Sequence, residues 1–281
     1  MVLNSARTIE MDSRAWLLFT LLCYAVGGLH ALLYAVLRRS VLTTVSVTAT
    51  LLGFACHTAA LALRWNESGH FPALGMHDGA MLLAWAIVLV FLAVYLTTRV
   101  DAAGVFAYPF AFALVFVSNL TPATEHVDPV LRSVYLPVHV FLAVFGYGAL
   151  FAAFSMGVLY LFQEKELRSR SPRRFYYLIP SLERSDTIGG RSVVGGFGFL
   201  TLAIVTGFLW NHSLHGRYWT GDPKEWAALT AWAIYVLILV ARWRGRWGGR
   251  RAAWLAIAGF AVVVFTFTWA TLVPGVAVAA R

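Results

Sequence analysis

Residues 79–98 read GAMLLAWAIVLVFLAVYLTT, twenty consecutive positions without a charged side chain. A helix of about 20 mostly apolar residues is long enough to cross the hydrocarbon core of a bilayer. Similar runs recur along the chain, whereas the alternating segments of about ten residues that are typical of a β-barrel do not. The predicted spans are 16–37, 41–63, 79–98, 102–120, 135–163, 192–211, 226–243 and 254–278. The sequence therefore predicts an all-α, polytopic membrane protein with about eight transmembrane helices.

The overall composition agrees with this fold class. Of the 281 residues, 60% are hydrophobic and only 12% are charged, about half the charged fraction of a typical soluble domain. The longest polar stretch, 164–191, leaves no room for a soluble domain, so we expect a single integral membrane domain over 1–281. The first apolar run is followed by two arginines without a small-residue cleavage site, which favours a retained helix over a cleaved signal peptide.

Charge is distributed unevenly between the two predicted sides of the membrane. With an external N-terminus, one set of loops holds 15 of the 22 Lys and Arg residues, and the other set, with both termini, holds 7. Because Lys and Arg accumulate in cytoplasmic loops, membrane topology accounts for the net charge of +9, and no nucleic-acid partner is expected. We predict a multi-pass protein of the plasma or inner membrane, with the loop at about 210–226 on the periplasmic or extracellular side.

The histidines gather on the side predicted to be external. They are His57, His70, His77, His126, His139, His212 and His215, with only His30 nearer the other side. His57 is expected about two turns inside its span and His139 about one turn inside. Ionisable groups within spans often mark functional sites, and a neutral imidazole is a good iron ligand. His57 and His139 are therefore interpreted as candidate axial ligands of a haem iron. The alternative is that each ring is only hydrogen-bonded between helices. Zinc is disfavoured, since neither H-E-x-x-H nor C-x-x-C is present.

The loop sequence NHSLHGRYWTGDPKEW (211–226) combines aromatic, basic and histidine side chains. A haem has a flat apolar ring and two anionic propionates, and Trp219 with Arg217 and Lys224 offers complementary surfaces. An interfacial aromatic belt is the alternative explanation for the tryptophans. Asp222, with Pro223 after it and Glu225 three positions on, also predicts a capping box that begins the seventh span.

A family resemblance rests on this loop and on three further segments. GRYWTGDPKEWAALTAWAIY resembles the tryptophan-rich haem-handling motif of the cytochrome c assembly family, the CcsA/ResC-like membrane proteins. Residues 53–85 resemble the family's G-H-x-P segment, 136–167 its histidine-bearing helix, and LVPGVAV (272–278) its closing P-G-x-H segment. The ordered set makes the resemblance specific.

The resemblance implies a component of c-type cytochrome biogenesis. Such a protein would hold haem b at the outer face for thioether attachment to an apocytochrome c, beside a thioredoxin-like or CcsB/ResB-like membrane partner. The resemblance leaves open whether it acts as an enzyme, as a component of a cytochrome c haem lyase/synthase, and no catalytic residue is assigned. His139 matches the external axial ligand. The candidate haem-binding residues are His139, His57, His215, His212, Trp219, Asp222, Arg217 and Lys224.

Four positions depart from the family pattern. Gly221 and His215 stand where tryptophans are usual, and Val240 and Ala277 stand where histidines are usual. Two expected haem-handling histidines are therefore missing. Either His212 or His215 takes over as a ligand, with His57 as the alternative, or the protein resembles the HemX-like branch, which would regulate or scaffold tetrapyrrole biosynthesis with little or no haem binding.

Overall fold

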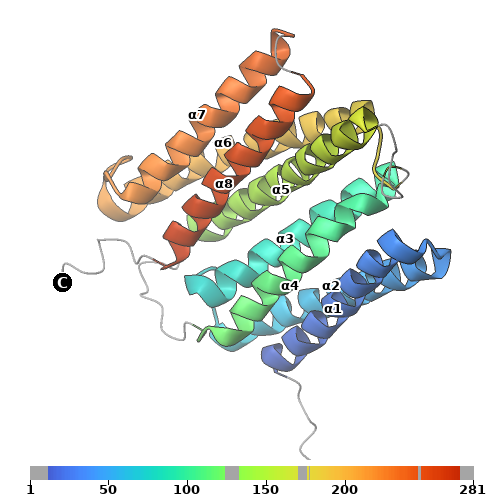
Figure 1. The fold of residues 1–281 in the computed structure, drawn as a ribbon. Helices are drawn as coiled ribbons and strands as arrows, with labels where there is room; N and C mark the ends of the chain where they lie inside the picture. The colour runs from blue at the N-terminus through green and yellow to red at the C-terminus, as the bar shows by residue number, and fades with distance from the viewer. Residues whose placement is uncertain (1–11, 124–132, 170–175, 177, 246–247, 273–281) are drawn as a thin grey trace, which may run out of the picture.

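Eight long helices make up the described part of the chain in a computed structural model (Figure 1). The structure describes residues 12–123, 133–169, 176, 178–245 and 248–272. The helices are α1 (Ser13–Leu37), α2 (Ser40–Ser68), α3 (Gly75–Thr98), α4 (Gly104–Leu120), α5 (Tyr135–Arg168), α6 (Leu182–His215), α7 (Pro223–Trp243) and α8 (Arg250–Leu272), with a short 3-10 helix, η1 (Asp101–Ala103), before α4. Among these residues all eight helices are long and apolar enough to span a membrane, α4 when it is counted together with η1. The predicted all-α fold class is confirmed.

Several helices continue beyond the apolar runs that predicted them. Helix α6 begins at Leu182 instead of 192 and contains 34 residues, which is about 50 Å at 1.5 Å per residue against a hydrocarbon core of about 30 Å. Its polar first turns are helical because Ser181 caps them, its hydroxyl accepting the Arg184 N–H at 3.3 Å. Helix α2 likewise continues to Ser68 and ends at Gly69, whose φ is 67°. An apolar run therefore indicates the part of a helix that suits the membrane interior, and it does not locate the residues where the helix begins and ends.

The helices form two neighbouring groups, α1–α4 and α5–α8, which meet where α3 packs against α5 (Figure 1). Within the first group α1 packs on α2 and α4, and α3 on α4; within the second α5 packs on α6 and α8, and α7 on α8. Aromatic rings join the two groups at the centre. Phe151 of α5 lies 5.0 Å from Phe110 of α4 and 5.4 Å from Phe260 of α8, measured between ring centroids.

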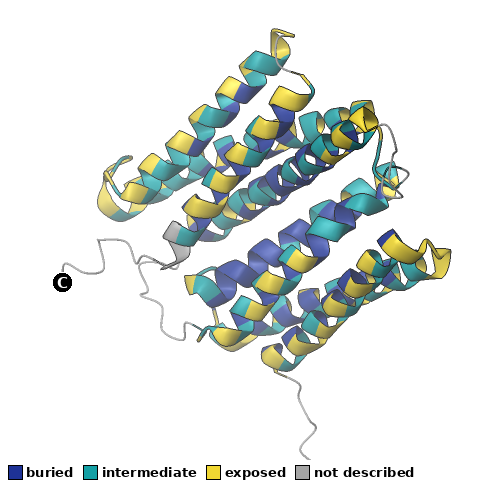
Figure 2. Cartoon of the chain, in the orientation of Figure 1, coloured by how far each residue is buried: buried dark blue, intermediate teal, exposed yellow. Residues whose placement is uncertain are grey.

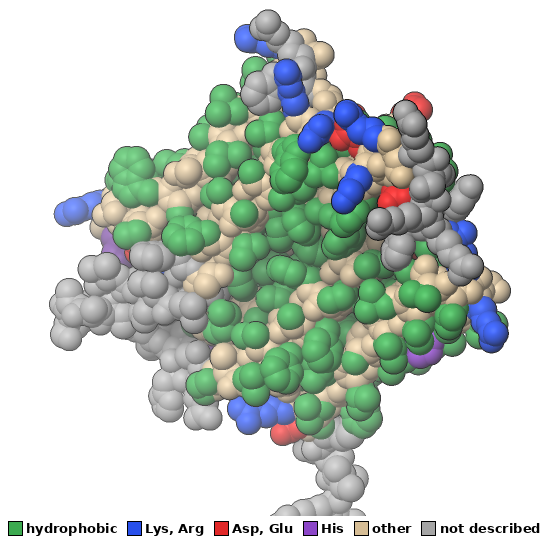
Figure 3. All heavy atoms as spheres, in the orientation of Figure 1, with side chains coloured by type: hydrophobic (Ala, Val, Ile, Leu, Met, Phe, Trp, Pro, Cys, Tyr) green, Lys and Arg blue, Asp and Glu red, His purple; other side chains and the backbone are tan. Residues whose placement is uncertain are grey.

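Burial follows this arrangement. Helices α3 and α5 run through the middle and are buried along much of their length, whereas α1 and α7 expose one face (Figure 2). Leu22 of α1 is 63% exposed and Leu237 of α7 is 68% exposed. Large exposed aliphatic side chains of this kind suit contact with lipid, and the space-filling view shows apolar side chains over most of one face (Figure 3).

The two ends of the molecule differ in charge. Helices α1, α3, α5 and α7 begin at the end where α2, α4, α6 and α8 finish. The 216–222 loop lies there, and we call it the loop end. The opposite end carries Arg38, Arg39, Arg99, Arg184 and Arg244 near the helix termini, and we call it the basic end. Many of the Lys and Arg side chains visible in Figure 3 gather at the basic end of α5–α8.

Three polar contacts tie α6 to α7 along their length. At the basic end, Arg242 forms a bidentate ion pair with Asp186, with N–O distances of 3.0 and 3.1 Å. Midway, the Trp232 indole N–H donates to the Thr201 hydroxyl at 3.0 Å. At the loop end, the Asn211 side-chain amide donates to the Glu225 carboxylate.

Candidate functional site

The start of α7 is fixed by Asp222, as the sequence predicted. Its Oδ1 accepts the Lys224 backbone N–H at 2.9 Å, and Pro223 occupies the first turn. An N-cap of this kind satisfies one of the backbone N–H groups that a helix leaves unpaired. The Asp222 carboxylate is therefore engaged in holding the helix.

Glu225 organises the loop more extensively than a capping box requires. Its carboxylate accepts from the Thr220 N–H and hydroxyl, from the Gly221 N–H and from the Asn211 side-chain amide, at distances of 2.5 to 3.2 Å. In a capping box the glutamate instead returns to the N–H of the cap residue itself. Here the glutamate pairs with the two residues before the cap, because the loop turns at Gly221, whose φ is 80°.

An aromatic cluster sits above the end of α6. Trp219 packs edge-on against Trp226, with ring centroids 5.0 Å apart, and against Phe208 of α6 at 6.1 Å. Trp219 is half-buried, and Trp226 is 60% exposed. The loop therefore presents a tryptophan platform at the loop end.

His139 lies in the first turns of α5 and faces α6. Its Nδ1–H donates to the Ala203 carbonyl at 2.7 Å, which leaves Nε2 as the basic nitrogen. Its ring centroid is 6.0 Å from that of Trp210. Gly207 makes the approach possible, because a Cβ at that position would lie 3.1 Å from Cε1 of His139. A histidine oriented through Nδ1 by a backbone carbonyl is the usual arrangement of a metal-binding imidazole.

The other histidines of the loop are more exposed. His212 stacks on Tyr218, with centroids 4.3 Å apart. His215 is the last residue of α6, and both His215 and Arg217 are exposed to solvent. These side chains share the loop end with His139. Predicted residues His126 and Ala277 lie outside the described residues.

His57 occupies a different environment. It is fully buried, and its Nδ1 lies 3.2 Å from the Tyr24 hydroxyl of α1. The ring also lies near the Met81 backbone of α3, and its Nε2 makes no hydrogen bond to any described residue. His57 is eleven residues from the end of α2, about three turns instead of two, while His139 is four residues from the start of α5. His57 lies one turn farther from the end of its helix than predicted because α2 continues past residue 63.

None of the interactions between described residues joins His57 to His139. His57 faces α1, whereas His139 faces α6. Across the described ranges no group of three or more His, Cys, Asp or Glu side chains is arranged to hold a metal ion.

Sequence reasoning missed a buried polar network at the loop end of α2, α3 and α4. Arg64 Nε lies 3.1 Å from the Asp78 carboxylate, and both side chains are buried. His77, also buried, is bound through Nδ1 to the Ser118 carbonyl at 2.7 Å. The signal available was that Arg64, His77 and Asp78 interrupt apolar sequence, since buried charges are expected to be paired.

These features define a multi-pass helical membrane protein with a capped, tryptophan-bearing loop at one end. The chain belongs to the cytochrome c assembly protein family, whose model matches residues 74–275. It is 32% identical to the cytochrome c biogenesis protein CcsA of Prochlorococcus marinus (strain MIT 9313), over 75% of this chain and 76% of the relative. It is 31% identical to that of Guillardia theta, over 76% and 78%.

A solved structure has the same fold. The chain is similar to the cytochrome c haem lyase CcmF with a TM-score of 0.72 and 15% sequence identity, over 95% of this chain and 48% of that one. The chain thus spans about half the length of this lyase, and the likeness concerns the fold alone.

Proposed function

We propose that this protein is a membrane component of c-type cytochrome biogenesis that binds haem b at the loop end and presents it for thioether attachment to an apocytochrome c. Membership of the cytochrome c assembly family supports the pathway. His139 carries the proposal for haem, because its Nδ1 bond to Ala203 orients the ring and leaves Nε2 to coordinate iron.

Other residues of the loop end have the chemistry to bind a haem as the substrate. Trp219 offers an apolar platform, and Arg217 and Lys224 offer cations for the propionates. Asp222 supports them indirectly by holding the first turn of α7. For the second axial position we favour His215 over His57, because His215 is exposed at the same end as His139, whereas His57 is fully buried against α1. His212 is the second choice, since its ring is stacked on Tyr218.

The proposed orientation puts the loop end outside the cell. Lys and Arg lie mainly at the basic end, which the positive-inside rule assigns to the cytoplasm. The proposed partners, an apocytochrome c and a thioredoxin-like or CcsB/ResB-like membrane protein, would then meet haem at the outer face of the plasma or inner membrane.

The visible spectrum of the purified protein tests the proposal. After expression with ample haem we expect a Soret band that His139→Ala abolishes or strongly weakens, with partial recovery in free imidazole. His30→Ala is the matched control, because His30 bonds to the Val26 carbonyl of its own helix, α1. His215→Ala should shift the spectrum toward high spin and His57→Ala should change it little. A folded protein that shows no Soret band and does not support c-type cytochrome formation would refute the proposal in favour of a HemX-like role.

A further inference from the structure

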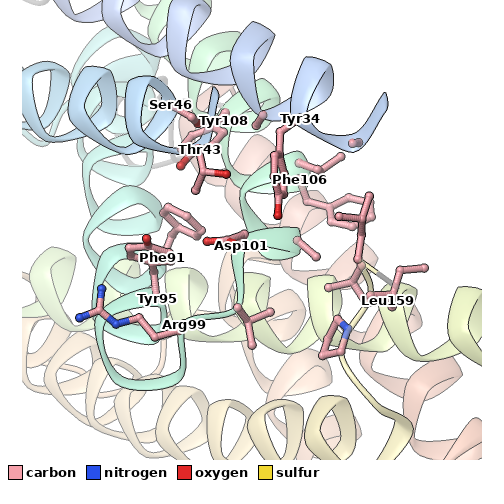
Figure 4. Close-up of a pocket in the computed structure, with 18 of the residues that line it drawn as sticks. Tyr34, Thr43, Ser46, Phe91, Tyr95, Arg99, Asp101, Phe106, Tyr108 and Leu159 are labelled. Atoms are coloured by element: carbon pink, nitrogen blue, oxygen red, sulfur yellow. The ribbon is translucent and has the colours of Figure 1, made fainter. Parts of the chain in front are cut away.

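A cavity of about 630 Å³ lies at the basic end, enclosed by α1 to α5, η1 and the residues that lead into α6 (Figure 4). This volume is within the range of about 300–1,000 Å³ that small-molecule sites occupy. None of the candidate haem-binding residues lines it, so it is separate from the site at the loop end.

Aromatic side chains form one wall of the cavity. Phe91 of α3 packs edge-on against Tyr108 of α4, with ring centroids 5.1 Å apart, and is stacked with Tyr95 at 6.1 Å. Tyr34 comes from α1 on another side, and Figure 4 shows its hydroxyl directed toward Asp101. Aromatic faces grouped in this way attract cations through their quadrupoles.

The Asp101 carboxylate lies among these rings and is only partly exposed. Within the described residues it makes no hydrogen bond or ion pair. Arg99 is close enough to interact with it electrostatically, but the Arg99 guanidinium lies over the Tyr95 ring, 5.6 Å from its centroid. The carboxylate is thus available to a ligand that brings its own positive charge.

The opposite side of the cavity is apolar and reaches an exposed apolar side chain. Phe106 of α4 and Leu159 of α5 line it, and Phe162, also of α5, is 51% exposed. Arg184 lies near the basic end of the cavity, where one guanidinium nitrogen donates to the Thr98 carbonyl. The remaining N–H groups of a guanidinium can still meet a phosphate.

We propose that this cavity binds a zwitterionic phospholipid of the membrane leaflet at the basic end through its ammonium headgroup. The ammonium group lies between Asp101 and the rings of Tyr34 and Tyr108, the phosphate faces Arg184, and an acyl chain follows Leu159 and Phe162 out to the bilayer. A carboxylate within an aromatic enclosure selects a cation, and the apolar exit selects a ligand with a hydrocarbon tail.

Binding of short-chain lipids to the purified, delipidated protein tests this assignment. We expect dihexanoyl phosphatidylethanolamine, below its micelle concentration, to bind at least tenfold more tightly than dihexanoyl phosphatidylglycerol, which lacks the ammonium group. Asp101→Asn should raise the dissociation constant for the ethanolamine lipid at least tenfold. Glu183→Gln is the matched control, since Glu183 is an exposed carboxylate at the same end and does not line the cavity.

The outcomes are separable. Equal affinity for the two lipids, tighter binding of the glycerol lipid, or an Asp101→Asn variant that binds like the control would each overturn the proposal. Displacement of the lipid by millimolar free ethanolamine would overturn the lipid assignment in favour of a soluble amine. If Asp101→Asn fails to fold, as judged by gel filtration and circular dichroism, the proposal is tested instead by lipid binding to Tyr34→Leu and by the comparison of the two lipids. No readout involves haem, so the result is independent of the proposed function.

Discussion

Replacing Glu225 by alanine should loosen the 216–222 loop more than removing the helix cap beside it. The carboxylate accepts hydrogen bonds from Thr220, Gly221 and Asn211. Bonds to a charged acceptor contribute about 1.5–3 kcal/mol each when buried, but Thr220 and Gly221 are exposed, so water replaces much of the loss. We estimate about 2 kcal/mol for the whole set, against about 1 kcal/mol for the Asp222 cap.

Trypsin cleavage of the Arg217–Tyr218 bond measures this loosening. When cleavage is slow relative to closing, its rate follows the population of the open loop. A change of 2 kcal/mol then predicts cleavage about 30-fold faster for Glu225→Ala, and 1 kcal/mol about fivefold for Asp222→Ala. Glu225→Gln should fall between, because it keeps one acceptor oxygen, and Asp222→Asn should stay near the unmodified protein. Glu183→Ala serves as a control at the far end of α6. If Glu225→Ala were cut no faster than Asp222→Ala, the hydrogen bonds to Glu225 would not be what holds the loop.

Two further predictions concern haem and orientation. Gly207→Val should weaken the Soret band, since the added side chain would displace the His139 ring. Gly195→Val is the control, because it lies on the same helix with open space around it and should leave the band unchanged. Equal loss of the Soret band in both variants would contradict the role of Gly207. To test the orientation, Arg217→Cys should react with a membrane-impermeant maleimide in intact cells, and Arg244→Cys should react only after permeabilisation. Labelling of Arg244→Cys but not of Arg217→Cys in intact cells would contradict the orientation.

The sequence predicted the number of helices well, because each span must be apolar to cross the hydrocarbon core. It did not predict where α2 ends or where α6 begins, since residues 64–68 and 182–191 are mostly polar and extend the helices outside the apolar runs. Capping by Asp222 was predictable because it depends on residues two positions apart.

The sequence did not predict which residues on distant helices are hydrogen-bonded to each other. His139 is bound to Ala203, 64 residues away, and nothing in either local sequence indicates that α5 and α6 pack together. The same holds for His57, whose partner Tyr24 lies on α1. Between helices in a bilayer, apolar side chains give little preference for one neighbour over another, so hydropathy locates helices without assigning their partners.

The three polar contacts between α6 and α7 therefore determine how these helices align. Asp186–Arg242, Thr201–Trp232 and Asn211–Glu225 follow one another along the two antiparallel helices, at intervals of 15 and 10 residues on α6 and of 10 and 7 residues on α7. A slip of one turn would displace the partners by about 5.4 Å and break all three at once. The hairpin therefore stays in a single register. The Asp186–Arg242 ion pair at the basic end, together with the other two contacts, determines the height of the tryptophan platform along α6, the helix to which His139 is hydrogen-bonded.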